Sequence, residues 1–291
     1  QSSVSSELRV AGRTWMLVPH LSLARTLPLL CSLAQPRVTS PRADDPSSRA
    51  RNIKTMLRSA QGVLWDVDGT LVESTDLAFV ATNEVLEANG RPQITVEQYK
   101  VGCKFTTPER FNVHTGSPPG DELGWKLGDE FDRTYVTRVS PETAGLFPGI
   151  DRLLRSLALA GHPQGVLSNA CGAYVRAVVA ANELDEVPGQ RLGLFKVALG
   201  ADEVAAAKPD PDGLLLCCER LGVDPASSVY VGDSPTDGQA ARAAGMTSVG
   251  VLWGAGEEAA LAASFDVVVP DVPELITALR DTFAAVAEEA H

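Results

Sequence analysis

After residue 59 the chain alternates short apolar runs with longer segments in which apolar residues recur at helical spacing. Short apolar runs that end in polar turns are typical of buried parallel strands, and the longer segments are typical of helices. The expected strands are 63–65, 165–167, 196–199, 229–231, 247–252 and 267–269. The expected helices are 75–89, 121–138, 149–160, 173–182, 211–221, 235–244 and one from Val272 onward. This alternation predicts an α/β fold with a doubly wound, Rossmann-like parallel sheet.

The alternation breaks between residues 76 and 145, where the pattern contains helices and loops but no strand. We therefore expect a helical cap at 76–145, inserted into an α/β core formed by 59–75 and 146–291.

Residues 1–58 differ from the rest of the chain in composition and charge. They contain 9 Lys and Arg against 3 Asp and Glu, whereas the remaining residues contain 16 against 34, which gives the whole chain a net charge of −12. A segment rich in Arg and Ser and poor in acid is typical of an organelle transit peptide. A disordered extension and translation from Met56 are the alternatives. The expected location is the cytoplasm or, with a transit peptide, the chloroplast stroma or mitochondrial matrix.

Several classes of protein and site are disfavoured by simple counts. The acidic balance argues against a nucleic-acid binder. The five cysteines are odd in number and form no C-x-x-C pair, which argues against a disulfide framework or a thiolate zinc site. No apolar run reaches the length of a membrane span.

Acidic clusters follow two of the expected strands. Asp66 and Asp68 lie in Asp-Val-Asp-Gly-Thr after the first strand, and Asp233 and Asp237 lie in Gly-Asp-Ser-Pro-Thr-Asp after the fourth. Ligands of open parallel sheets bind at the carboxyl ends of the strands. Four carboxylates gathered there would repel one another without a cation, and Mg²⁺ prefers oxygen ligands. We therefore expect a Mg²⁺ site.

Three further polar residues occupy matching positions. Ser168 and Asn169 follow the second strand, where both can donate hydrogen bonds to phosphate oxygens, and Lys208 follows the third. A cation is needed to offset the charge of a phosphoryl group beside carboxylates. Each of these residues alone is more often a turn, a cap or a solvated side chain. Their shared position at strand ends, in this order, favours a phosphoryl-transfer site.

These motifs resemble the haloacid dehalogenase superfamily of phosphohydrolases over about residues 61–285. The stretch from Lys208 to Gly254 is most similar to the phosphoglycolate phosphatase branch. The resemblance implies Mg²⁺-dependent hydrolysis of a small phosphate monoester, with 2-phosphoglycolate as the expected substrate. Within this superfamily, the dehalogenases lack an acid at the position of Asp68. The presence of Asp68 therefore favours a phosphatase or a phosphomutase.

The resemblance also implies a role for each residue of the motifs. Asp66 is the expected nucleophile, which forms an aspartyl-phosphate, and Asp68 is the expected general acid and base. Mg²⁺ is expected at the Asp66 carboxylate, the Asp68 carbonyl and Asp233, with Asp237 in a supporting position. The expected phosphate-binding residues are Thr70, Ser168 and Asn169, with Lys208 as a catalytic cation.

The cap is expected to select the substrate. Lys104, Thr107 and Arg110 are its candidate residues, because a basic side chain there can pair with a substrate carboxylate. Together with Lys208, they are expected to form a positive rim. The alternatives are a β-phosphoglucomutase-like sugar phosphomutase and a non-catalytic subunit that binds a partner through the basic tail. The expected partner is a small phosphorylated metabolite, and the oligomeric state stays open.

Overall fold

A computed structural model describes residues 60–185, 193–277 and 279. The basic segment 1–58, with the three alternatives for it, lies outside the described residues. Within the described part of the chain, no helix is both long enough and apolar enough to cross a membrane.

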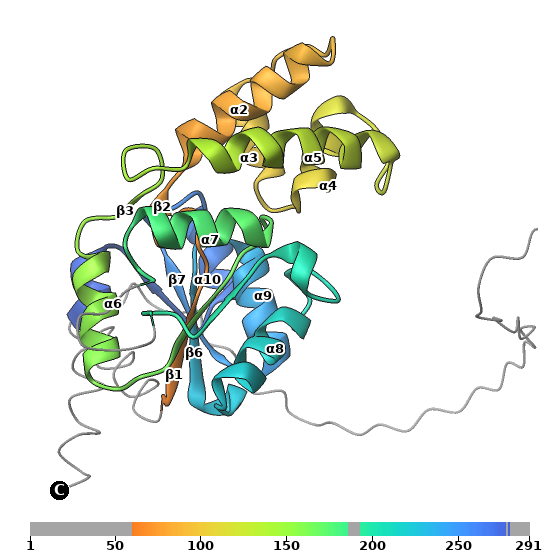
Figure 1. The fold of residues 1–291 in the computed structure, drawn as a ribbon. Helices are drawn as coiled ribbons and strands as arrows, with labels where there is room; N and C mark the ends of the chain where they lie inside the picture. The colour runs from red at the N-terminus through yellow and green to blue at the C-terminus, as the bar shows by residue number, and fades with distance from the viewer. Residues whose placement is uncertain (1–59, 186–192, 278, 280–291) are drawn as a thin grey trace, which may run out of the picture. The chain divides into compact units, whose positions relative to one another are not determined.

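Six parallel strands form one sheet in the order β5-β4-β1-β6-β7-β8 (Figure 1). These strands are β1 Gly62–Trp65, β4 Gln164–Leu167, β5 Val197–Leu199, β6 Ser228–Gly232, β7 Thr247–Val251 and β8 Val267–Val269. Helix α6 Ile150–Leu159 precedes β4, and the helices that follow the later strands are α7 Gly172–Ala181, α8 Asp212–Leu221, α9 Pro235–Ala244 and α10 Glu258–Ser264. The α/β sheet predicted from the hydrophobic pattern is thus confirmed.

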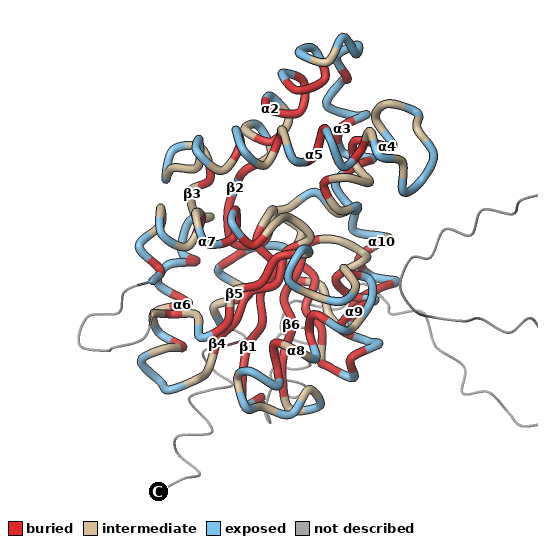
Figure 2. The backbone as a smooth tube through the Cα atoms, turned by 45° about the vertical axis from the view of Figure 1, so that its right-hand side comes forward, coloured by how far each residue is buried: buried red, intermediate tan, exposed pale blue. Residues whose placement is uncertain are grey.

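Alternate residues of β1 face opposite sides of the sheet. Val63 and Trp65 belong to one apolar cluster, which includes residues of α6 and α7, whereas Leu64 belongs to the cluster beneath α8 and α9. Helices therefore cover both faces of the sheet, as in a doubly wound fold. Figure 2 shows the result: the strands are buried and the exposed positions lie on the outer faces of the helices.

The order of the strands reverses at β1. The chain passes from β4 to β5 on one side of β1 and then returns to β6 on the other side. β1 pairs with β4 through Val63↔Gln164 and with β6 through Leu64↔Tyr230. The carboxyl ends of these three strands meet at this switch point, which is where parallel α/β sheets bind ligands.

Four α-helices lie between the short strands β2 (Val72–Glu73) and β3 (Gly145–Leu146) in the sequence and form the inserted helical region (Figure 1). They are α2 Thr75–Ala88, α3 Val96–Gly102, α4 Thr107–Thr115 and α5 Glu122–Tyr135. The segments that enter and leave this region pair as a short antiparallel ribbon of β2 and β3. The division of the chain into core 59–75 and 146–291 and cap 76–145 stays a prediction.

The start of α8 differs from the expectation. The expected helix begins at residue 211, but α8 begins at Asp212 and Pro211 is the capping position. The side chain of Asp210 accepts a hydrogen bond from the Asp212 backbone N–H at 3.0 Å. The capping bond expected of an aspartate is therefore made one residue before the cap position.

Candidate active site

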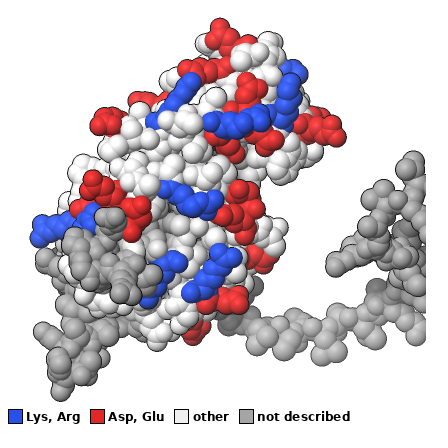
Figure 3. Space-filling model, viewed as in Figure 1, with Lys and Arg blue, Asp and Glu red and all other residues white. Residues whose placement is uncertain are grey.

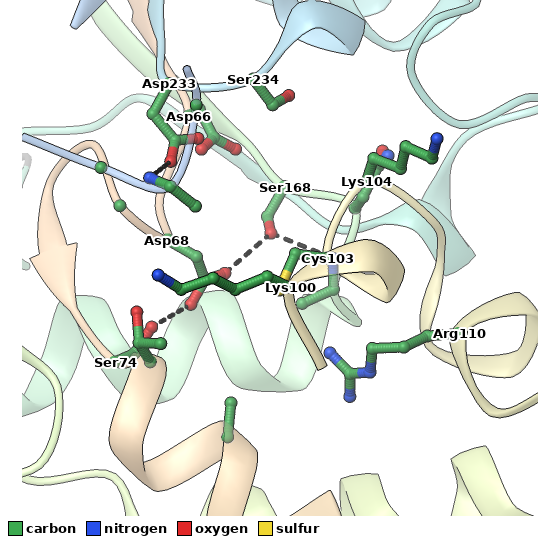
Figure 4. Close-up of a pocket in the computed structure, with 18 of the residues that line it drawn as sticks. Asp66, Asp68, Ser74, Lys100, Cys103, Lys104, Arg110, Ser168, Asp233 and Ser234 are labelled. Carbon is green, nitrogen blue, oxygen red and sulfur yellow. Dashed lines mark hydrogen bonds between the residues drawn. The ribbon is translucent and has the colours of Figure 1, made fainter. Parts of the chain in front are cut away.

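The predicted catalytic residues gather where β1, β4 and β6 end (Figure 4). Asp66 directly follows β1, and its backbone N–H still bonds to the Val231 carbonyl of β6 at 2.9 Å. Ser168 directly follows β4, and Asp233 directly follows β6. The sheet register therefore places these side chains around one cavity.

Lys208 occupies the centre of a buried ion cluster. Its Nζ atom donates to Asp66 Oδ1 at 2.6 Å and to Asp237 Oδ1 at 2.7 Å. The Tyr230 hydroxyl lies 2.9 Å from the same nitrogen. Burial alone would lower the pKa of Lys208, but Asp237 and Asp66 outweigh that effect and raise the pKa above its ordinary value. Lys208 therefore carries a positive charge beside the predicted nucleophile.

The expectation that Lys208 lies on a positive rim of the pocket is wrong. Only 6% of the residue is exposed, and its charge is taken up by two carboxylates. On the face seen in Figure 3, acidic and basic side chains are interspersed over the described surface.

Three buried carboxylates form a candidate metal site. One oxygen from each of Asp66, Asp233 and Asp237 lies within 4.8 Å of the others. Burial raises the pKa of Asp66 to about 7, against the opposing effect of Lys208. Burial, with the charges of Asp66 and Asp237, raises the pKa of Asp233 well above its ordinary value. Burial and the mutual repulsion of the three carboxylates thus outweigh the effect of Lys208.

Two glycines allow the Asp233 carboxylate to approach the backbone closely. A Cβ atom added to Gly69 or to Gly254 would lie 2.2 Å from Asp233 Oδ2, and Gly69 also has a φ of +73°. The same Oδ2 accepts the Ala255 N–H at 2.7 Å. Asp233 Oδ1 takes no part in this bond, and a carboxylate oxygen beside two other carboxylates is the kind of ligand that Mg²⁺ prefers.

The predicted phosphate-binding residues take different positions. The Thr70 hydroxyl donates to Asp66 Oδ2 at 3.3 Å. Ser168 accepts the Ala170 N–H at 3.0 Å and lines the cavity. The Asn169 amide bonds twice to the Lys208 backbone, accepting its N–H and donating to its carbonyl, both at 3.0 Å. Asn169 thus fixes the loop that carries Lys208, and its phosphate-binding role stays a prediction.

Asp68 points away from the three carboxylates. Its Oδ1 accepts hydrogen bonds from the hydroxyls of Ser74 and Tyr174, and its Oδ2 lies 3.5 Å from Ser168 Oγ (Figure 4). This carboxylate lies between Ser168 and the first helix of the cap. The Asp68 side chain therefore has other hydrogen-bond partners than Asp66, whose carboxylate is bound by Lys208 and Thr70.

The inserted helices form one wall of a cavity of about 800 Å³ above these residues. The three predicted cap residues Lys104, Thr107 and Arg110 all line it. Lys104 is exposed, Thr107 is buried and Arg110 is half-buried. The Arg110 guanidinium carbon lies 4.6 Å from the centre of the Phe131 ring. A positive charge is therefore present on the cap side of the cavity.

Sequence reasoning missed three hydroxyl-bearing residues of the site: Ser74, Tyr174 and Tyr230. Tyr230 donates to Asp237 Oδ1 at 3.0 Å from the middle of β6. A tyrosine inside a fully buried strand needs a partner for its hydroxyl, so its position carried a signal. Ser74 and Tyr174 gave no comparable signal, because they lie at a loop end and on a helix.

Comparison with known proteins agrees with this geometry. Residues 63–251 match the family model of the haloacid dehalogenase-like hydrolases. Phosphoglycolate phosphatase of Escherichia coli strain K12 is 32% identical over 240 residues, which cover 75% of this chain and 92% of that protein. Phosphoglycolate phosphatase of Xanthomonas campestris pv. campestris strain 8004 is also 32% identical, over 225 residues that cover 75% of this chain and 96% of the relative.

A solved structure shows the same fold. A protein of Bacteroides fragilis assigned to the haloacid dehalogenase-like hydrolases superposes with a TM-score of 0.66 at 26% identity, over 74% of this chain and 99% of its own. The family model spans most of the described core, including the strand ends that carry Asp66, Ser168 and Asp233. The chain belongs to the haloacid dehalogenase-like hydrolase family.

Proposed function

We propose that this protein is a Mg²⁺-dependent phosphatase that hydrolyses a small phosphate monoester, with 2-phosphoglycolate as its substrate. The main support is the buried contact between Asp66 and Lys208 beneath the cap-covered cavity. The 32% identity to phosphoglycolate phosphatases supports the choice of substrate.

Asp66 is the proposed nucleophile. Its carboxylate attacks phosphorus, an aspartyl-phosphate forms, and the bond to the leaving alkoxide breaks. Lys208 holds the reacting carboxylate and offsets the charge of the phosphoryl group. The Thr70 hydroxyl also holds this carboxylate, through its hydrogen bond to Asp66 Oδ2. Ser168 is positioned to donate to a phosphoryl oxygen.

Asp68 is the proposed proton carrier. In its acid form it gives a proton to the leaving alkoxide. In its ionised form it then takes a proton from the water that attacks the aspartyl-phosphate, so that Asp66 and inorganic phosphate are released. Proton transfer of this kind requires a carboxyl group apart from the nucleophile, which matches the separation of Asp68 from Asp66.

Asp66, Asp233 and the backbone carbonyl of Asp68 are the proposed ligands of Mg²⁺. When bound, the ion supplies positive charge to the phosphoryl oxygens. Asp237 keeps Lys208 in place, since both of its oxygens are used, one by Lys208 and Tyr230 and the other by Ser234.

Lys104 and Arg110 are the proposed partners of the substrate carboxylate. Both lie on the cap side of the cavity, opposite the carboxylates of the core. An ion pair between one of these cations and the substrate would distinguish 2-phosphoglycolate from 2-hydroxyethyl phosphate, which lacks a carboxylate.

A substrate panel tests this proposal. The purified protein with Mg²⁺ is offered 2-phosphoglycolate, 2-hydroxyethyl phosphate, hexose phosphates, nucleotides and pyrophosphate, and phosphate release is measured. We expect the highest kcat/KM for 2-phosphoglycolate, with Lys104→Met and Arg110→Met reducing that preference. Lys126→Met, an exposed site outside the cavity wall, is the control. A hexose phosphate that reacts only with a bisphosphate present would instead favour the mutase alternative.

A further inference from the structure

The two oxygens of the Asp68 carboxylate have different surroundings. Oδ1 accepts two hydrogen bonds, from Ser74 Oγ and from the Tyr174 hydroxyl, each with an O–O separation of 2.5 Å. Among the described residues, Oδ2 has one longer hydrogen bond, which it accepts from Ser168 Oγ at 3.5 Å on the cavity side. An oxygen that already accepts two hydroxyl protons has little capacity left, so the proton of the acid form belongs on Oδ2. The anchored oxygen therefore aims the other one at the proposed phosphoryl site.

Tyr174 is held rigidly for this contact. It lies in the first turns of α7, the helix that follows β4 and Ser168, and only 1% of it is exposed. Its hydroxyl donates to Asp68 Oδ1, and a buried tyrosine hydroxyl normally requires such a partner.

The cap packs directly on Tyr174. The ring of Tyr135, which ends α5, stacks on the ring of Tyr174 with 4.8 Å between centroids and 25° between planes. Phe131 stacks in turn on Tyr135 at 4.5 Å. Tyr135 is 3% exposed, so the contact is fully inside the protein. A residue of the inserted helices is therefore in direct ring contact with the residue that anchors Asp68.

We propose that Tyr174 is a positioning residue for Asp68 and that Tyr135 transmits the placement of the cap to it through the ring stack. This inference rests on the proposed phosphatase function. Tyr174 does not touch the substrate; it orients the carboxylate that protonates the leaving group. The effect of losing its hydroxyl should therefore depend on how much the leaving group needs a proton.

The leaving group provides the test. We compare kcat/KM for the best alkyl monoester of the panel with kcat/KM for p-nitrophenyl phosphate, whose leaving phenolate is stable without protonation. Tyr174→Phe keeps the ring and its stack but removes the donor. We expect about a 10-fold loss for the alkyl ester and a change below about 2-fold for the aryl ester, since general acid catalysis acts on the first only.

Three further variants examine the parts of the inference. Tyr135→Leu removes the stack together with the Tyr135 hydroxyl and should produce a selective loss of the same kind, smaller than that of Tyr174→Phe, whereas Tyr135→Phe keeps the stack and should stay closer to the wild type. Thr82→Val is the control: Thr82 carries a buried hydroxyl on α2 that donates to the Ala78 carbonyl, and it does not line the cavity. Its ratio of alkyl to aryl kcat/KM should equal that of the wild type. Circular dichroism checks that each variant is folded.

An equal loss on both esters, or no loss on either, in folded Tyr174→Phe would overturn the inference, because a merely structural role affects the two substrates alike. An unselective loss in Tyr135→Leu would overturn the part assigned to the cap. If the wild type hydrolyses no monoester of the panel, the proposed function itself fails and this inference fails with it. If the wild type is active but Tyr174→Phe shows no selective loss on the alkyl ester, only the role of Tyr174 is contradicted.

Discussion

The Lys208 ammonium lies 2.6 Å from Asp66 Oδ1, and both groups are buried. The contact joins residues that are 142 positions apart in the sequence. It is possible because β1 and the loop before α8 end at the same edge of the sheet. The Asn169 side chain also holds this loop, since it binds both the N–H and the carbonyl of Lys208. Lys208 thus neutralises charge within the buried cluster that it forms with Asp66 and Asp237.

Lys208→Met should reduce both activity and stability. The variant leaves Asp66 and Asp237 buried without their cation, and breaking a buried ion pair in this way costs about 3 kcal/mol. We expect the free energy of unfolding to fall by that amount, and kcat to fall by about 100-fold or more, since charge stabilisation is lost in the transition state. Urea unfolding and phosphate release measure the two effects.

Lys196→Met is the control for this prediction, because Lys196 is an exposed lysine on the approach to β5. It should behave as the wild type in both assays. Near-normal activity in Lys208→Met would show that the ion cluster is not part of the catalytic machinery.

Asp233→Asn should make the protein more stable than the wild type in the absence of Mg²⁺ and less stable than the wild type in its presence. Without the ion, the substitution removes a buried charge that repels Asp66, so the free energy of unfolding should rise by on the order of 1 kcal/mol. With Mg²⁺, the wild type gains stability by binding the ion, and the variant should gain much less. Thermal unfolding in EDTA and in Mg²⁺ measures both.

Asp129→Asn, at an exposed position of α5, should respond to Mg²⁺ as the wild type does. If Asp233→Asn keeps the full Mg²⁺-induced increase in melting temperature, Asp233 is not a ligand of the ion.

His114 should make stability depend on pH. Burial, with a contribution from the charge of Arg110, lowers the pKa of His114 to about 4 from its ordinary value of 6.5. The folded protein therefore keeps this histidine neutral while the unfolded chain takes up a proton. Stability from this source is complete above pH 6.5 and falls as the pH drops toward 4, by about 2 kcal/mol once solvent screening of this half-buried side chain is allowed for.

His114→Gln should remove that dependence. Burial also raises the pKa of Asp132 to about 6, which acts in the opposite direction between its ordinary value of 3.8 and 6. The informative quantity is thus the difference in unfolding free energy between wild type and variant at several pH values. A difference that stays constant from pH 7 to about pH 4 would contradict the assignment to His114.

Regular elements with strong local signals were predictable from the sequence. Helix α9 has the predicted bounds of 235–244, since Pro235 begins it and Gly245 adopts the left-handed conformation that ends it. The strand ends with Asp66 and Asp233 were predictable because apolar runs stop at charged residues.

Features that depend on long-range contacts were not predictable. The ribbon of β2 and β3 joins residues 72–73 to 145–146, and neither segment has a strand pattern of its own. The hydrogen bond from Tyr174 to Asp68 likewise depends on how α7 packs against the sheet and against Tyr135. The bonds from Asn169 to the Lys208 backbone depend on the path of a loop. Local sequence contains no information on such distances.

The proposal that Asp66 attacks phosphorus is tested most directly by phosphate release from 2-phosphoglycolate in Mg²⁺, with Asp66→Asn beside the wild type. The amide keeps the shape of the carboxylate but is not a nucleophile. We predict steady release by the wild type and none above background by a folded Asp66→Asn variant. Equal release by the two proteins would contradict the account.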